Sequence, residues 1–431
     1  MKIKEITHYI NVWSIFILAL TIRLLLSPEN HVDEQRYLLL SDQIVAGNFD
    51  LDAGSFICAP FTPYFIAGLK LLLPNSWYVL LFVLQAFISA LCVFSLYQIS
   101  LLLFNNNRAA LLGALIYAVY PDTFMYVRMV GQEVFFQAFL IFSVHFLLKY
   151  IANKKNHDIF LSAIFFSFCF LTKSFILFWS PFIVLYLFLH KTLSLKNKII
   201  ASSIYTLTCV VFTMPFGFYN LSKHNQYLLS SNGGSVMFWV GSSEYAYTVG
   251  ILKKSYETEL PEQALVDTAY QIYSIAPPST NIEKYFKLRN SWGSPSEIQN
   301  KFWRASVQWV KANPIKFLKL HCYYAFRFIF PGHKTPNTPT YLLIIIFLYS
   351  ALLYFGAFLG LKHALKLDFQ KHNWLLTLWL TMLLFSTIFA IQVRFRVITI
   401  DSFCCLYAAF FIREFLKKYH NSFLLSLFKT Q

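Results

Sequence analysis

The sequence predicts an all-α polytopic membrane protein with about ten transmembrane helices and a small α or α+β extracytoplasmic subdomain. Of the 431 residues, 57% are hydrophobic and only 13% are charged, and the mean hydropathy is +0.53. This composition is too apolar for a soluble domain. Apolar runs of about 17–25 residues recur, which is the length a helix needs to cross hydrocarbon. The runs lack the alternating pattern of barrel strands. They are therefore predicted to be helices, in which the backbone N–H and C=O groups form hydrogen bonds within each segment.

The predicted spans follow the apolar runs in chain order. They cover residues 9–26, 77–104, 109–121, 130–149, 158–172, 174–190, 199–215, 340–361, 374–392 and 397–412. The first run resembles a signal peptide, but it is long, lacks a small-residue cleavage pattern and leads into further spans. We therefore expect it to be an uncleaved first helix.

The basic residues set the predicted orientation. If the N-terminus is cytoplasmic, five basic stretches fall on the inner side, as the positive-inside rule requires. They are Arg108, Lys149/Lys154/Lys155, Lys191/Lys196/Lys198, Lys362/Lys366/Lys371 and Arg413/Lys417/Lys418. The net charge of +16 is thus spread over short loops and not gathered on one soluble face. This pattern predicts contact with membrane lipids and no binding of nucleic acid.

The outer segment at about 216–338 is too long to be a simple connector and divides the chain. The predicted parts are an N-terminal transmembrane module (1–215, including a first outer loop at 27–76), an extracytoplasmic subdomain (216–338) and a C-terminal transmembrane module (339–431).

Local motifs predict some structure inside the subdomain. Ser294-Pro295-Ser296-Glu297 has the pattern of a capping box with proline at the first helical position. The helix expected after Pro314 mixes basic and aromatic residues, which suits the membrane interface better than a span. The segment 230–241 combines a turn motif with an apolar, strand-like run.

The seven cysteines lie mostly within apolar runs and show no CxxC or histidine spacing. They are expected to be packing residues, not disulfides or zinc ligands. No metal and no cofactor are expected.

The first outer loop holds the strongest candidate site. Asp33 and Glu34 follow a span directly, and two adjacent carboxylates are costly near lipid unless they are used. An acid/base or binding role is expected, and an ordinary solvated loop is the alternative. Arg36 and Tyr37 follow on a short amphipathic helix that ends at Gly47.

Arg128, Glu133 and Lys173 lie at the outer ends of later spans. Glu133 begins a span, so it either interacts with the helix dipole or serves as a second active-site acid. Lys173 lies in a tight turn, where it either reaches the lipid headgroups or holds a lipid phosphate.

Arg394 and Arg396 lie at the outer boundary of the last span, against the inside-positive trend. Guanidinium groups match phosphate oxygens in a fork geometry, and headgroup contact is the alternative.

Taken together, these motifs resemble the GT-C class of polytopic glycosyltransferases, in particular bacterial family 39-like relatives of protein O-mannosyltransferases and of the lipid A aminoarabinose transferase. The matching residues are Asp33-Glu34 with Tyr37, Pro121, Arg128, Glu133, Leu171-Thr172-Lys173, Asn220, Ser231-Asn232-Gly233-Gly234, Trp239, Gly241, Trp309-Val310-Lys311, Pro314, Phe317 and Arg394-Phe395-Arg396. Relatives tend to have prolines after the basic pair, whereas Val397–Asp401 has none.

The resemblance implies a GT-C fold and an inverting transfer of sugar from a polyprenyl-phosphate donor to an acceptor hydroxyl. It places the active site on the periplasmic face of a bacterial inner membrane. Asp33 is implied to be the general base, and Glu34 or Glu133 to orient the acceptor or the sugar. The residues implied to bind substrate are Arg36, Tyr37, Arg128, Lys173, Arg394 and Arg396, of which Lys173, Arg394 and Arg396 would hold the leaving lipid phosphate.

Two other functions compete with this one. A flippase or transporter of a lipid-linked sugar would also place charges near spans, but the sequence shows neither the repeats nor the interrupted helices expected of one. A polysaccharide polymerase or ligase would not require the early Asp33-Glu34 pair. A structural scaffold would give no reason for charges from four segments to gather on one side. The sugar, the acceptor (lipid A, another glycan, a lipid or a protein) and the oligomeric state stay open.

Overall fold

The computed structural model describes residues 11–26, 28, 34–52, 57–252, 294–329, 340–389 and 393–428. These residues are almost entirely helical, and their extended pairing is an isolated antiparallel bridge between Asp52 and Ile57. The all-α class predicted from the sequence is confirmed for this part of the chain.

The helices follow one another in this order: α2 (Val12–Leu24), α3 (Glu34–Val45), α4 (Phe61–Leu72), α5 (Trp77–Phe104), α6 (Asn107–Val119), α7 (Pro121–Phe124), the 3-10 helix η1 (Met125–Arg128), α8 (Glu133–Asn153), α9 (Asn156–Thr172), the 3-10 helix η2 (Ser174–Trp179), α10 (Ser180–Leu189), α11 (Leu195–His224), α12 (Gly234–Gly241), α13 (Glu244–Tyr247), the π-helical turn η3 (Thr248–Leu252), α16 (Pro295–Ala312), α17 (Pro314–Ile329), α18 (Thr340–Leu367), α19 (Phe369–Ile388), α20 (Val393–Arg396), the π-helical turn η4 (Val397–Asp401) and α21 (Ser402–Phe428).

A helix occupies each of the ten segments for which a span was predicted. By length and composition, five helices of the described chain are able to cross a membrane on their own. The number is six if α6 and the following Pro121–Arg128 helix, which bend by 62°, form one broken span. The chain is therefore a multi-pass membrane protein, and the count of ten spans stays a prediction.

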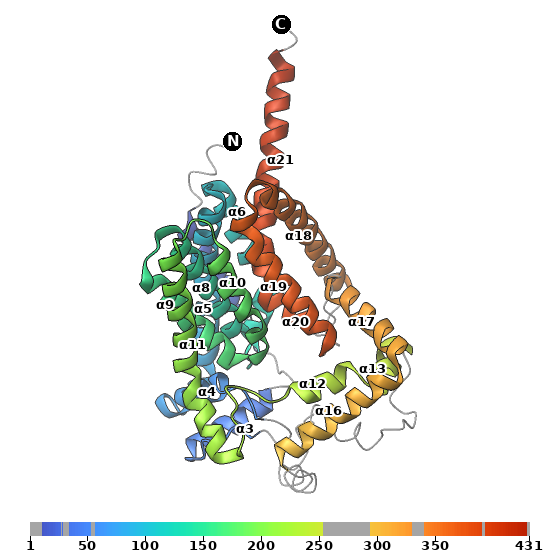
Figure 1. The fold of residues 1–431 in the computed structure, drawn as a ribbon. Helices are drawn as coiled ribbons and strands as arrows, with labels where there is room; N and C mark the ends of the chain where they lie inside the picture. Colours follow the sequence, from blue (N-terminus) through green and yellow to red (C-terminus); the bar gives the residue numbers. More distant parts are fainter. Residues whose placement is uncertain are drawn as a thin grey trace.

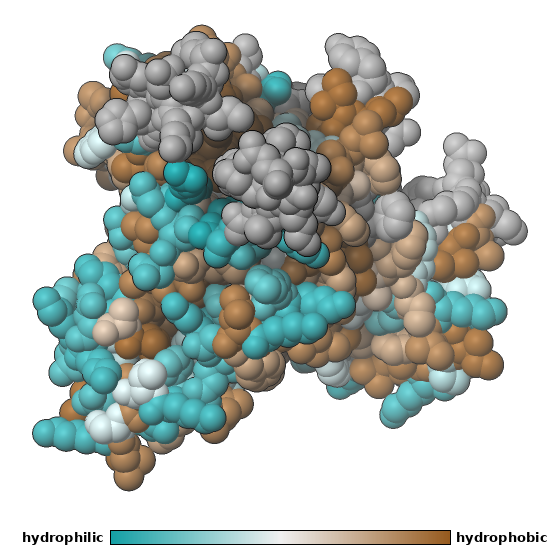
Figure 2. Space-filling view, turned by 90° about the horizontal axis from the view of Figure 1, so that it is seen from above, coloured by the Kyte–Doolittle hydropathy of each residue, from teal (hydrophilic) through white to brown (hydrophobic). Residues whose placement is uncertain are grey.

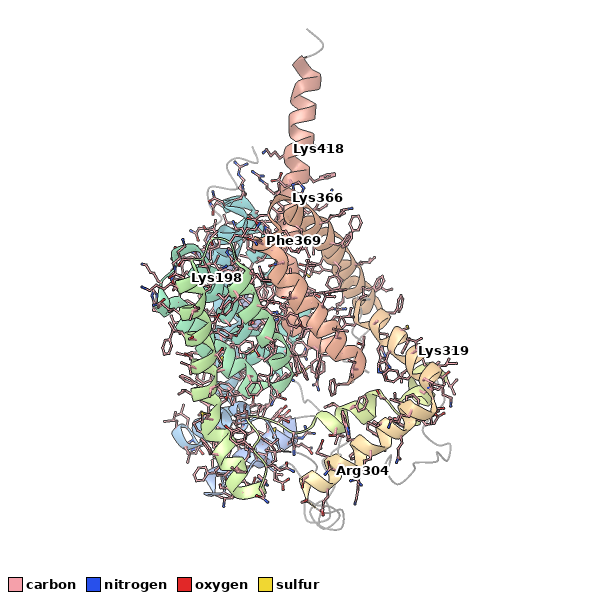
Figure 3. All side chains as sticks on the ribbon, in the orientation of Figure 1. Lys198, Arg304, Lys319, Lys366, Phe369 and Lys418 are labelled. Atoms are coloured by element: carbon pink, nitrogen blue, oxygen red, sulfur yellow. The ribbon has the colours of Figure 1, made fainter. Side chains whose placement is uncertain are left out.

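The long helices run between two different ends of the molecule (Figure 1). At one end α21 rises away from the bundle, and at the other α3, α4, α12 and α16 form a layer of shorter helices. Lys198, Lys366 and Lys418 lie toward the first end, whereas Arg304 and Lys319 lie toward the second (Figure 3). Figure 2 looks onto the first end and shows hydrophilic residues gathered over much of its left and centre. This arrangement agrees with the first end as the cytoplasmic one.

Small residues allow the C-terminal helices to pack closely. Gly356 and Gly360 form a GxxxG pattern on α18, facing α21. A Cβ atom at Gly360 would come within 2.0 Å of the Tyr407 carbonyl oxygen, so only glycine fits there. Association of spans depends on such close packing, because lipid supplies no hydrophobic drive between them.

A buried arginine supports the break after α6. The Arg23 side chain is 1% exposed and donates hydrogen bonds to Ser89 Oγ (2.8 Å) and to the Ala118 carbonyl oxygen (3.1 Å). Ala118 lies in the last turn of α6, whose carbonyls lose their helical partners where Pro121 starts a new helix. A cation is favourable at such a C-terminal end.

At the second end of the molecule, one local prediction is confirmed and another is wrong. Ser294 and Glu297 form the predicted capping box at the start of α16. The predicted strand-like run within 230–241 is instead helix α12.

Burial alone would raise the pKa of Glu244, but hydrogen bonds from Lys316 and Trp309 outweigh it and hold that pKa below its ordinary value.

We expect the two ends to lie on opposite sides of the membrane. A cysteine replacing the exposed Arg304 should react with a membrane-impermeant maleimide in intact cells, whereas one replacing the exposed Lys366 should react only after permeabilisation. Both variants are compared in a background with Cys322, the exposed cysteine of the described chain, changed to serine. Labelling of both positions from outside would contradict this orientation.

Candidate functional site

A cavity of about 680 Å³ lies where α3, η2, α12, α16, α19 and α20 meet. Four of the residues predicted from the sequence to bind substrate line it: Arg36, Tyr37, Lys173 and Arg394. They come from segments up to 358 positions apart in the sequence and are brought together only by the fold. The other residues that line the cavity include Cys58, Gln132, Phe170, Phe175, Phe178, Asn232, Gly234, Trp303, Phe385 and Phe389.

Glu133 joins two of these cations. Its Oε1 atom lies 3.0 Å from Lys173 Nζ and 3.5 Å from Arg394 Nη1. Its side chain is 6% exposed, against 10% for Lys173 and 18% for Arg394. One buried carboxylate thus faces two partly exposed cations beside the cavity.

The local backbone explains how these three side chains meet. Glu133 is the first residue of α8, where the helix dipole favours a carboxylate. A Cβ atom at Gly131 would come within 2.6 Å of Glu133 Oε2, so glycine leaves room for this side chain. Lys173 ends α9 in an extended conformation, and its ammonium lies 5.7 Å from the centre of the Phe395 ring.

The first outer loop contributes helix α3 to the cavity wall. Arg36 and Tyr37 line the cavity and are nearly fully buried, as is Glu34, the first residue of the helix. Glu34 does not line the cavity, and Asp33 lies outside the described residues. The helix packs on α4, to which an ion pair between Asp42 and Lys70 (2.5 Å) also binds it.

Arg128 and Arg396 do not line the cavity. Arg128 ends the 3-10 helix η1. Arg396 is 2% exposed and donates to the Phe328 carbonyl oxygen (2.9 Å). Its guanidinium also lies 3.3 Å from Asp401 Oδ1 and 4.7 Å from the centre of the Tyr354 ring.

Asp401 is the centre of a buried network that was not predicted. Its Oδ2 accepts a hydrogen bond from Tyr354 (2.6 Å) and lies 2.9 Å from the Tyr120 hydroxyl, which lies equally close to Asp122 Oδ2 (2.9 Å) and donates its single proton to one of these two carboxylates. The network links the break after α6 to α18 and to the start of α21. In the sequence, the only indication of this network was Asp401 itself, a carboxylate inside the last apolar run.

The turn before α12 forms another wall of the cavity. Asn232 Oδ1 accepts a hydrogen bond from the Ile57 N–H (2.7 Å), which ties this turn to the first outer loop. The Ser235 N–H donates to Gln299 of α16 (3.2 Å). The resemblance to GT-C glycosyltransferases included this turn among its matching motifs. The hydrophobic periodicity of the sequence could not show that the turn is bound by Ile57 and Gln299.

Within the described residues, no three His, Cys, Asp or Glu side chains lie close enough together to hold a metal ion. The cations Lys173, Arg394 and Arg36 make the cavity suited to an anion.

Residues 58–219 match the sequence model of a family described as dolichyl-phosphate-mannose-protein mannosyltransferase. The archaeal oligosaccharyltransferase AglB from Archaeoglobus fulgidus, solved in complex with an inhibitory peptide and a dolichol-phosphate, is similar in structure with a TM-score of 0.55 at 13% sequence identity; the match covers 96% of this chain and 51% of that one. The apo form of the Archaeoglobus fulgidus oligosaccharyltransferase gives a TM-score of 0.53 at 14% identity, covering 96% and 52%. No curated protein sequence matches the chain.

The chain thus spans about half the length of these oligosaccharyltransferases. The structural likeness shows a shared fold, and the family match covers the segment that contains Glu133 and Lys173 but ends before Arg394. The GT-C resemblance predicted from the sequence is confirmed at this level.

The buried ion pairs of Glu133 should support the folded state. We expect Glu133→Gln to lower the free energy of unfolding by about 1–3 kcal/mol, because Lys173 and Arg394 lose their shared counterion. Glu244→Gln is the matched control: its ion pair with Lys316 is more exposed and should be worth about 0–1 kcal/mol. Thermal unfolding of the purified proteins measures both. Equal shifts for the two variants would contradict a structural role for the Glu133 pairs.

Proposed function

We propose that this chain, which has the fold of GT-C glycosyltransferases, moves a sugar from a polyprenyl-phosphate donor to an acceptor hydroxyl at the outer face of the membrane. The observation that carries the proposal is the meeting of Lys173 and Arg394 around Glu133 beside one cavity. These cations, with the nearby Arg36, suit the phosphate of a lipid-linked donor. Their position toward the end opposite the basic loops supports an outer site.

In the proposed reaction, the acceptor hydroxyl gives its proton to Asp33 and its oxygen attacks the anomeric carbon of the donor sugar. A new C–O bond forms on the face opposite the phosphate, which inverts the anomeric centre. The bond from the anomeric carbon to the phosphate oxygen breaks, and the lipid phosphate leaves with the electron pair. Glu133 keeps Lys173 and Arg394 in place before substrate arrives.

The cations contribute most when they face charge that develops in the transition state. The bridging oxygen of the donor gains negative charge as the bond breaks, and fixed cations stabilise it without the reorganisation that water would need. Lys173 and Arg394 are held on rigid elements, one at the end of α9 and one on α20. Such preorganisation supports a catalytic role more than a transport role, because a transporter must release its substrate on the other side.

Lys173→Ala should weaken binding of a lipid phosphate about 10–100-fold, because a charge-assisted contact in a partly buried cavity is lost. Binding of undecaprenyl phosphate to the purified chain measures the effect. Lys70→Ala is the control, since Lys70 also pairs with a carboxylate but lies outside the cavity. Unchanged affinity in Lys173→Ala would remove the phosphate-binding assignment.

Asp33→Asn should lower transfer about 10²–10⁴-fold and leave binding of undecaprenyl phosphate unchanged, because a general base acts on the acceptor and not on the phosphate. The assay follows radiolabelled sugar from polyprenyl-phosphate donors in membranes that contain equal amounts of each protein. Asp42→Asn, an exposed acid of helix α3, should transfer normally. Full transfer by Asp33→Asn would show that another group takes the proton.

A further inference from the structure

The cavity has a second wall whose chemistry differs from that of the cationic one. Trp303 of α16 lies on it, together with the turn Ser231–Gly234 and with Ser235. We propose that this sugar-binding wall, defined by Trp303, Ser231, Gly234 and Ser235, holds a pyranose ring. The inference rests on the proposed function and adds to it the site and the means by which the sugar itself is recognised.

Trp303 is the main reason for this assignment. Its side chain is 48% exposed although it belongs to a helix that packs on α12, and its ring lies 5.1 Å from that of Phe238. One part of the indole is thus supported by the protein while another is left open at the cavity. The C–H face of a sugar ring is apolar and slightly positive, so it packs well on the electron-rich face of an indole.

The rest of the wall supplies small polar groups, as recognition of a sugar requires. The Ser231 hydroxyl accepts a hydrogen bond from the Gly233 N–H (3.3 Å), which leaves its proton for another acceptor. Hydroxyl groups of a sugar can exchange hydrogen bonds with such side chains and with nearby backbone. A few convergent polar groups beside an aromatic surface are typical of ligand sites.

Contacts from outside the wall hold it in place. Asn232 is bound to the first outer loop through Ile57, and Gln299 binds the Ser235 N–H. Two distant segments of the chain, at Ile57 and Gln299, therefore fix the same short turn. A wall that is already ordered loses little conformational entropy when a ligand binds.

Gly234 sets the space available to the ring. A Cβ atom at this position would have only Phe389 Cε1 within 4 Å, at 4.0 Å, and both residues line the cavity. The glycine is therefore not needed for packing in its surroundings. A side chain at position 234 would occupy open space beside Phe389 and reduce the room for a ligand.

Both walls belong to the same cavity, in which Lys173 and Arg394 face the phosphate of the proposed donor. The sugar on the second wall can be the one attached to that phosphate or the terminal sugar of the acceptor. The chemistry of recognition is the same in both cases, and separate assays distinguish them.

The test compares wild type with Trp303→Ala in detergent or nanodiscs, with Trp13→Ala, a more exposed indole on α2, as control. The probes are undecaprenyl phosphate and undecaprenyl phosphate that carries mannose, glucose or galactose. We expect Trp303→Ala to bind the bare lipid phosphate normally and the best sugar-bearing lipid about two- to tenfold more weakly. Normal binding of both lipids, with a higher KM only for a glycan acceptor, assigns the wall to the acceptor sugar and also supports the proposal.

A second variant guards against a folding defect. Gly234→Ala should unfold at the same or a higher temperature than wild type, since alanine favours a helix, and should weaken binding of the sugar in the same assays. If Trp303→Ala and Gly234→Ala both match wild type in every sugar-dependent assay, the inference is overturned.

Failure of the proposed function gives a different result. In that case wild type does not bind undecaprenyl phosphate, and the wall is tested with methyl glycosides of the same three sugars. Binding by wild type that is lost in Trp303→Ala supports a sugar-binding wall in a protein of other function, and no binding by wild type overturns it.

Discussion

The fold must place charges at a membrane boundary without leaving them unpaired. Glu133 meets this constraint by facing both Lys173 and Arg394, from three segments that are distant in sequence. An isolated cation there would be strongly disfavoured, and a fully neutralised group could not attract an anion. Two cations that share one carboxylate are paired at rest, and both line the cavity in which the proposed phosphate would bind.

The cationic group depends in turn on buried contacts deeper in the bundle. Arg394 and Arg396 lie on the same short helix, and Arg396 is held by Asp401 and by the carbonyl of Phe328. Asp401 is also bound by Tyr120, beside the break after α6. One arginine thus anchors the helix while the other lines the cavity. Residues two apart on a helix point about 200° away from each other, which permits this division.

The sequence predicted the positions of the long helices well, because a backbone in lipid has to form its hydrogen bonds within each span. It also predicted that Arg36, Tyr37, Lys173 and Arg394 would belong to one site. It could not predict that Arg394 lines the cavity and Arg396 does not. Both were assigned to the site from their position at a membrane boundary, which does not give the direction of a side chain. Helix α12 was missed because a short apolar run has no clear period, and Gln299, which binds its first turn, comes from far along the chain.

The cavity is lined by residues from both ends of the chain, from Arg36 to Phe395. A ribosome therefore completes the first contributors long before the last ones leave the exit tunnel. Until α20 has been synthesised and inserted, Glu133 and Lys173 lack the ion pair that Arg394 adds. No shorter translation product holds the complete cationic group, so a chain truncated anywhere before α20 would lack it however well its earlier helices had inserted.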